Sequence, residues 1–124
     1  MGNKLEHSFE NGILTIYLVG DYSIQEILDR LESCFNEYAS GKPIGVLIDA
    51  TRSQSNRSLE EIRRYMPQIE KWKDRVLGFA VLVASDFLFG LTNQASAYAE
   101  ISGLELRPFR DPDEAISWIQ EKVG

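Results

Sequence analysis

Two short apolar runs constrain this sequence more than any other feature. IGVLIDA, at residues 44–50, and LGFAVLVA, at residues 77–84, are nearly continuous stretches of apolar residues. Such runs are typical of strands that are covered on both faces. The segment between them has the apolar spacing of a helix, and a strand, a helix and a second strand in succession indicate a parallel pair with a crossover. We therefore expect an α/β protein.

A β-hairpin is predicted before the first of these runs. Residues 12–19, GILTIYLV, alternate in polarity and are β-branched in places, and residues 4–9 form a weaker strand pattern. Asn11-Gly12 between the two segments is a strong signal for a two-residue turn. We expect the two strands to form an antiparallel hairpin at the edge of the sheet.

Helix starts can be located from capping residues. Two helices begin at capping boxes, in which a serine is followed three residues later by a glutamate: Ser23 with Glu26, and Ser58 with Glu61. Cys34 falls on the apolar stripe of the first helix, so we interpret it as a core residue rather than a nucleophile. Pro67 interrupts the second helix and predicts a kink or an early end there.

The C-terminal third continues the alternation of helices and strands. The stretch from Asp86, expected as a helix cap, to Gly103 has the pattern of a helix with an irregular start. LELRPF follows as a strand, whose Pro108 belongs at a sheet edge or a strand end. Asp111 caps a last helix with Pro112 in its first position.

The predicted order is therefore ββ-α-β-α-β-α-β-α. The expected fold is an N-terminal β-hairpin plus a mostly parallel sheet of about five strands flanked by four helices, in the manner of an α/β domain. We expect a single domain over residues 1–124, because domains typically hold roughly 100–150 residues.

Charge and composition exclude several classes of protein. The chain has 13 Lys and Arg against 19 Asp and Glu, a net charge of −6, whereas binding to a nucleic-acid backbone requires clustered positive charge. A single cysteine permits no internal disulfide and fits a reducing compartment. No apolar run approaches the ~20 residues of a membrane span, and no secretory signal is visible. We expect a cytoplasmic protein without cofactor.

The loop after the 44–50 strand is the first candidate binding site. It joins Asp49, at the expected strand end, to a helix start whose backbone amides are unpaired and partly positive. An anion, a phosphate or a phosphorylated serine could bind there. In the alternative interpretation the serine only caps the helix and the arginines are solvated. The candidate residues are Asp49, Thr51, Arg52, Ser53, Ser55, Arg57 and Ser58.

An apolar turn is the second candidate site. Four large apolar side chains follow the strand at residues 77–84, and they exceed what one helix face can bury: Phe87, Leu88, Phe89 and Leu91. They could line a small apolar pocket or form a patch against a second copy. Alternatively, two of them pack on each neighbouring layer.

Other chemistries find less support in the residues. DATRS, at residues 49–53, matches the metal-ion-dependent adhesion motif D-x-[ST]-x-S, but no further ligand loops can be identified, so no metal is predicted. A phosphoreceiver domain needs a lysine at the position where this chain has Arg107, so we reject that function. The one histidine, His7, lies on the predicted hairpin, and no nucleophile motif or phosphate-binding loop occurs. Asp49 and Asp86 could act as a carboxylate pair, but we predict no catalytic residues.

With the hairpin, the VLID strand and the serine-capped helix in place, the chain resembles the STAS domain, the fold of anti-sigma-factor antagonists. It is similar in particular to the bacterial STAS-like group related to the CRAL-TRIO lipid-binding domain. The resemblance covers about residues 11–119 and rests on GILTIYLVGDYS, GVLIDATRSQSNRSLEEIRRY, FAVLVASDFLFGLTNQASAYAEISG and FRDPDEAISWI. It implies that Ser58 matches the serine that a partner kinase phosphorylates to switch binding of an anti-sigma factor. Asn56-Arg57-Ser58-Leu59 stands here in place of the family's Asp-Ser-Ser-Gly.

Three functional hypotheses follow. In the first, a non-catalytic STAS-like module binds a protein partner, or itself, through the loop at residues 49–58 and the turn at residues 87–91. In the second, the module holds a lipid or an anionic metabolite at the same end of the sheet. An enzyme that depends on Asp49 and Asp86 is the third.

Overall fold

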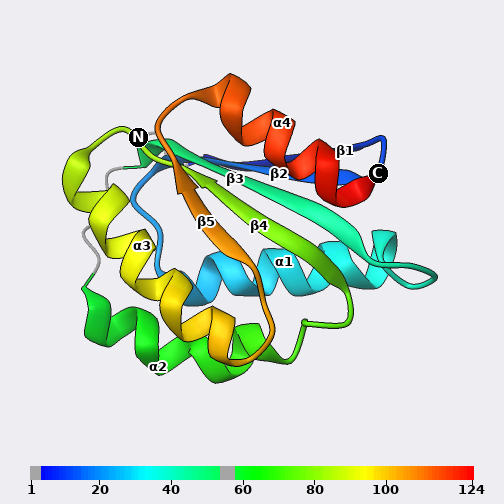
Figure 1. Cartoon of the computed structure of the whole chain (residues 1–124), viewed down its shortest axis with the longest axis horizontal. Coiled ribbons are helices and arrows are strands. Elements are labelled where there is room, and N and C mark those ends of the chain that lie inside the picture. Colours follow the sequence, from blue (N-terminus) through cyan, green and yellow to red (C-terminus); the bar gives the residue numbers. More distant parts are fainter. Residues whose placement is uncertain (1–3, 54–57) are drawn as a thin grey trace.

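The computed structural model describes residues 4–53 and 58–124 and confirms the predicted α/β fold (Figure 1). The described residues form a five-stranded sheet and four helices. The strands are β1 (Lys4–Glu10), β2 (Ile13–Gly20), β3 (Ile44–Ser53), β4 (Val76–Leu82) and β5 (Leu106–Phe109). The helices are α1 (Ile24–Tyr38), α2 (Leu59–Glu70), α3 (Asp86–Ile101) and α4 (Pro112–Val123).

The order of the strands in the sheet is the order of the strands in the chain. β1 and β2 are antiparallel, and β2, β3, β4 and β5 follow as parallel neighbours. Each parallel crossover therefore moves the chain in the same direction, and right-handed crossovers then place their helices on the same face. Figure 1 shows α1, α2 and α3 on one face of the sheet and α4 on the other.

The hairpin turn confirms the prediction from Asn11-Gly12. Both residues have positive φ, 54° for Asn11 and 81° for Gly12, as a two-residue type I′ turn requires. The strands pair without a break from Lys4 opposite Val19 to Glu10 opposite Ile13. The turn thus fixes the register of the whole hairpin.

Side-chain caps begin each of the described helices. In each case a side-chain oxygen accepts from a backbone N–H in the first turn: Ser23 from Glu26, Ser58 from Glu61, Ser85 from Leu88, and Asp111 from Asp113. The expected cap at Asp86 is wrong by one residue, because Ser85 has the extended backbone of a cap and Asp86 is already helical.

The predicted end of the 44–50 strand is also wrong. β3 continues to Ser53, so Asp49 lies within the strand, between Tyr17 of β2 and Leu82 of β4. Polar residues can extend this strand because hydrogen bonding to β2 continues beyond Asp49, past an irregularity in the register. Of the two outcomes expected at Pro67, the early end is wrong, since α2 runs to Glu70 with Pro67 inside it, and a kink there stays a prediction.

The larger core lies between the sheet and helices α1 to α3. Phe35 is fully buried and meets the ring of Trp72 edge-on at 4.9 Å, and the indole N–H of Trp72 donates to Glu32 at 2.7 Å. Cys34 is buried beside them, as predicted, and desolvation raises the pKa of its thiol, against a lowering by Arg30. A thiol in this setting stays protonated and is a poor nucleophile.

Helix α4 approaches the opposite face at positions where the sheet has no side chain. A Cβ on Gly45 would lie 2.8 Å from Cγ1 of Ile119, and one on Gly78 would lie 3.0 Å from the ring of Trp118. The short distance of α4 from β3 and β4 therefore depends on these two glycines.

We predict that Gly45→Ala lowers the free energy of unfolding by about 1–3 kcal/mol, because the added methyl group overpacks the contact with Ile119. Gly41→Ala is the matched control, since a Cβ there meets nothing within 4 Å. Urea denaturation measures both variants, and an equal effect of the two would contradict the close packing of α4.

Candidate functional site

An apolar cavity lies between the sheet and the three helices on its larger face. Its volume is about 180 Å³. Side chains of β2, β3, β4, α1, α2 and α3 line it, among them Leu18, Ile48, Val81, Leu28, Ile62 and Leu88. Ser53, Thr92 and Trp72 are the residues with polar side-chain atoms in an otherwise aliphatic and aromatic lining.

Small side chains on facing elements explain why this space remains open. Ala50 of β3 and Ala95 of α3 both line the cavity, in an interior that otherwise packs with large aliphatic and aromatic groups. The cavity is partly open to solvent, so a small molecule could enter it. A concave, mostly apolar space of this kind is the first candidate for a ligand site.

The four residues of the predicted apolar turn lie on two sides of helix α3, two toward the cavity and two toward solvent. Leu88 and Leu91 line the cavity, together with Thr92 and Ala95, which follow at helical spacing. Phe87 is 67% exposed and Phe89 36% exposed. The turn therefore supplies both a cavity wall and exposed aromatic surface.

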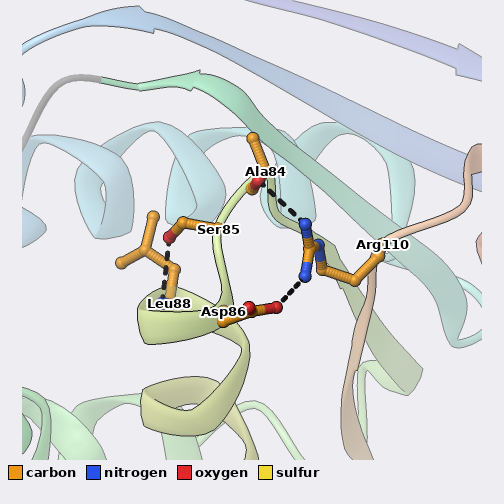
Figure 2. A network of polar contacts seen from close by, with 5 residues as sticks. All are labelled: Ala84, Ser85, Asp86, Leu88 and Arg110. Carbon is orange, nitrogen blue, oxygen red and sulfur yellow. Dashed lines mark hydrogen bonds and ion pairs between the residues drawn. The ribbon is translucent and has the colours of Figure 1, made fainter.

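Arg110 connects the start of α3 to the end of β5, as Figure 2 shows. Its guanidinium donates to the carbonyl of Ala84 at 3.2 Å and forms an ion pair with Asp86. Ser85 accepts from the backbone N–H of Leu88 in the same turn. Because the ion pair is exposed, it contributes little stability, but together these contacts orient the first turn of α3.

Sequence reasoning missed Arg110. The signal available was its position directly after a parallel strand, since carboxyl ends of neighbouring parallel strands meet at one edge of the sheet. Arg110 after β5 and Asp86 after β4 therefore had to be near each other.

Asp49 faces the other side of the sheet. It lines a groove of about 520 Å³ beside α4, together with Thr15, Tyr17 and Ile116. Its carboxylate accepts from the backbone N–H of Thr51 at 3.1 Å and from the Thr51 hydroxyl at 2.6 Å. Asp49 and Asp86 thus have separate partners.

The predicted loop site is only partly visible. Ser53 lines the cavity and Arg52 is exposed, whereas Ser55 and Arg57 lie outside the described residues. Ser58 is exposed and uses its hydroxyl as the cap of α2, accepting from Glu61 at 3.1 Å. An anion site in this loop, and phosphorylation of Ser58, stay predictions.

Two further findings concern metals and membranes. Within residues 4–53 and 58–124, no three His, Cys, Asp or Glu side chains are grouped so that they could hold a metal ion. Over the same residues, none of the helices combines the length and the apolar character of a membrane span.

Comparison with solved structures identifies the fold. The chain is similar to an uncharacterized protein of the DUF3478 family with a SpoIIAA-like fold from Shewanella loihica PV-4, with a TM-score of 0.64 and 18% identity over 95% of this chain and 94% of the other. It is also similar to an anti-sigma factor antagonist from Mycobacterium paratuberculosis, with a TM-score of 0.55 and 14% identity over 96% and 95% of the two chains. No protein-family model matches the chain, and no match is found among curated proteins.

We predict that Ala50→Val raises the free energy of unfolding by about 1 kcal/mol, because the added methyl groups enter the cavity and gain contacts. Ala80→Val on the neighbouring strand is the matched control. Ala80 is fully buried against the α4 side, so the same change there overpacks and costs about 1–3 kcal/mol. Chemical denaturation of both variants checks the prediction, and destabilisation by Ala50→Val would argue against an open space at that position.

Proposed function

We propose that this chain, which has the STAS-like fold, is a non-catalytic binding module that holds a small apolar molecule between its sheet and helices α1 to α3. The observation that carries this proposal is the cavity of about 180 Å³. The topology agrees with it. A strand order without reversal offers no crevice of the kind that binds ligands in doubly wound sheets, so a ligand needs a different place.

The lining defines the class of ligand. A buried water requires two to four polar partners, and a mostly aliphatic and aromatic wall offers few of them. An engineered cavity of ~150 Å³ with a similar lining stays dry and binds benzene. The volume here suits a single aromatic ring or a short alkyl chain. Of the two ligand classes considered from the sequence, the lining favours the lipid-like one over the anionic metabolite.

We predict that benzene raises the midpoint of thermal unfolding, because a ligand that binds only the folded state stabilises it. At a free concentration of about ten times the Kd, the stabilisation is about 1.4 kcal/mol. Differential scanning calorimetry with and without benzene measures the shift. Native mass spectrometry of freshly purified protein tests for a ligand acquired during expression.

Two variants of α3 provide the control for this prediction. Ala95 is buried at the cavity wall and Ala97 is exposed on the same helix. We expect Ala95→Leu to abolish the benzene shift, because the larger side chain occupies the space, and Ala97→Leu to retain it. A missing shift in the wild-type protein, or equal shifts in the two variants, would refute the proposed ligand site.

A second candidate function is docking of a protein partner on the first turn of α3. Phe87 favours it, since a phenylalanine with 67% of its surface exposed is costly to keep in water. Ser85 and Arg110 hold this turn in place, so the ring is presented from a fixed backbone. Binding of a partner would bury this ring, and aromatic side chains that become buried at an interface dominate its energetics.

We predict that Phe87→Asp weakens binding of a partner at least about tenfold, because it removes an aromatic anchor and buries a charge. Ile101→Asp is the matched control, as Ile101 is 85% exposed at the other end of α3. The partner is isolated by affinity capture from cells that naturally express the protein and then titrated in purified form. Equal affinity for the wild-type protein and Phe87→Asp would exclude this surface.

A further inference from the structure

The face of the sheet that carries α4 is only partly covered. α4 packs closely on β3 and β4, at Gly45 and Gly78. On β2, the side chains that face α1 to α3 are buried, whereas Ile13, Thr15 and Tyr17 on the α4 side are only half-buried. Neighbouring strands lie about 4.8 Å apart and a helix with its side chains is about 10 Å wide, so β1 and β2 together offer the width of one helix.

The groove of about 520 Å³ beside α4 lies on this strip of the sheet. One stripe of α4 forms a wall of the groove from the first turn of the helix to its last: Pro112, Ile116, Ile119, Gln120 and Val123. Ser8 and Glu10 of β1 line the groove as well, each opposite a lining residue of β2. At 1.5 Å per residue the stripe on α4 is about 16 Å long, the length of three helical turns. The groove is therefore elongated and has the dimensions of a short helix.

The charged side chains that line the groove are acidic. Among the described lining residues they are Glu10 and Asp49, and none is a lysine or an arginine. Glu6 lies on the same side of β1 and is exposed. Arg52 pairs with Val19 farther along the strands and is not one of the lining residues. Because the protein interior has a low dielectric constant, carboxylates along a groove concentrate a negative potential in it and attract cations.

Asp49 and Tyr17 provide a place for one cationic group. They are register partners on β3 and β2, so their side chains are neighbours in the groove. Among the described residues, both bonds to the carboxylate come from Thr51 and end on Oδ1. Oδ2 can therefore accept from a lysine or an arginine of a partner, and the ring of Tyr17 can contact the same cation.

The two carboxylates lie at different ends of the groove. Glu10 is opposite Ile13, and Asp49 is beside Tyr17, which is about 13 Å farther along β2 at 3.3 Å per residue. Apolar surface lies between these ends, and Ile116 on the α4 wall is 40% exposed. An apolar centre with an acid at each end is complementary to a helix that has an apolar stripe and basic residues beside it.

We propose that this groove binds a basic amphipathic helix of a partner protein, which lies beside α4 on β1 and β2. Its apolar stripe contacts Ile13 and Ile116, and its basic residues contact Glu10 and Asp49. This is the helix-in-groove mode of recognition. Charge selects this occupant, since a second copy of the chain brings a net charge of −6 to an acidic groove, and an anionic membrane surface is repelled in the same way. The site is on the face opposite the cavity and does not depend on a ligand there.

A synthetic peptide tests the proposal. The probe has about 14 residues, with leucines at helical spacing and lysines elsewhere, and spans about 21 Å as a helix. Titrated into isotope-labelled protein, it should shift the backbone amide signals of Thr15, Tyr17 and Ile116. The signals of Leu88 and Thr92 at the cavity should not move. Circular dichroism should show a gain of helix in the bound peptide. A shuffled peptide of the same composition should bind about tenfold more weakly, because it has no apolar stripe.

Charge variants of the protein provide the control. Glu10→Lys should weaken binding of the peptide about tenfold or more, because an attraction becomes a repulsion. Asp49→Asn, which keeps an oxygen for Thr51, should weaken it about threefold or more. Glu100→Lys is the matched control, since it makes the same change of charge at an exposed residue in the last turn of α3, on the other face of the sheet.

Five results would overturn the proposal. They are a wild-type protein that does not bind the peptide, amide shifts confined to residues outside the groove, and no gain of helix on binding. The others are a shuffled peptide that binds equally well, and equal weakening by Glu10→Lys and Glu100→Lys.

Discussion

The strictly sequential order of the strands is the constraint on which the rest of this structure depends. Since each parallel crossover steps the same way across the sheet, helices α1, α2 and α3 share one face and leave the other to α4. Three helices over five strands enclose a wide interior, and small residues such as Ala50 and Ala95 leave part of it unfilled. On the opposite face, a single helix covers β3 and β4 and leaves the outer part of β1 and β2 beside a groove.

The two faces of the sheet differ in how closely the helices pack against them. On the α4 side, Gly45 and Gly78 let the helix approach so closely that an added methyl group would overlap its side chains. On the other side, large residues such as Phe35 and Trp72 fill the interior around the cavity. A close contact fixes α4, whereas the larger layer contains the space in which a ligand could be held. Helix α3 therefore contributes to the wall of the cavity, whereas α4 does not.

Much of the fold and part of the candidate site follow from local sequence. Asn11-Gly12 specifies a turn that needs two positive φ angles, and Ser23, Ser58 and Asp111 each cap the helix they were expected to begin. These are short-range effects, in which a side chain bonds to backbone a few residues away. The end of β3 was not predictable in this way, because Asp49 remains in the strand owing to its pairing with β2 and β4.

The sequence by itself determined the class of fold, the hairpin and the starts of most helices, because apolar periodicity and capping act within a few residues. Tertiary structure alone decided where the candidate residues face. Asp49 and Ser53 are four residues apart, yet one lines the groove beside α4 and the other the cavity beneath α3. Leu88 and Phe87 are neighbours in the chain, but packing against the sheet turns one inward and leaves the other in solvent. The direction of a side chain relative to a layer depends on which elements cover that layer, and distant parts of the chain provide them.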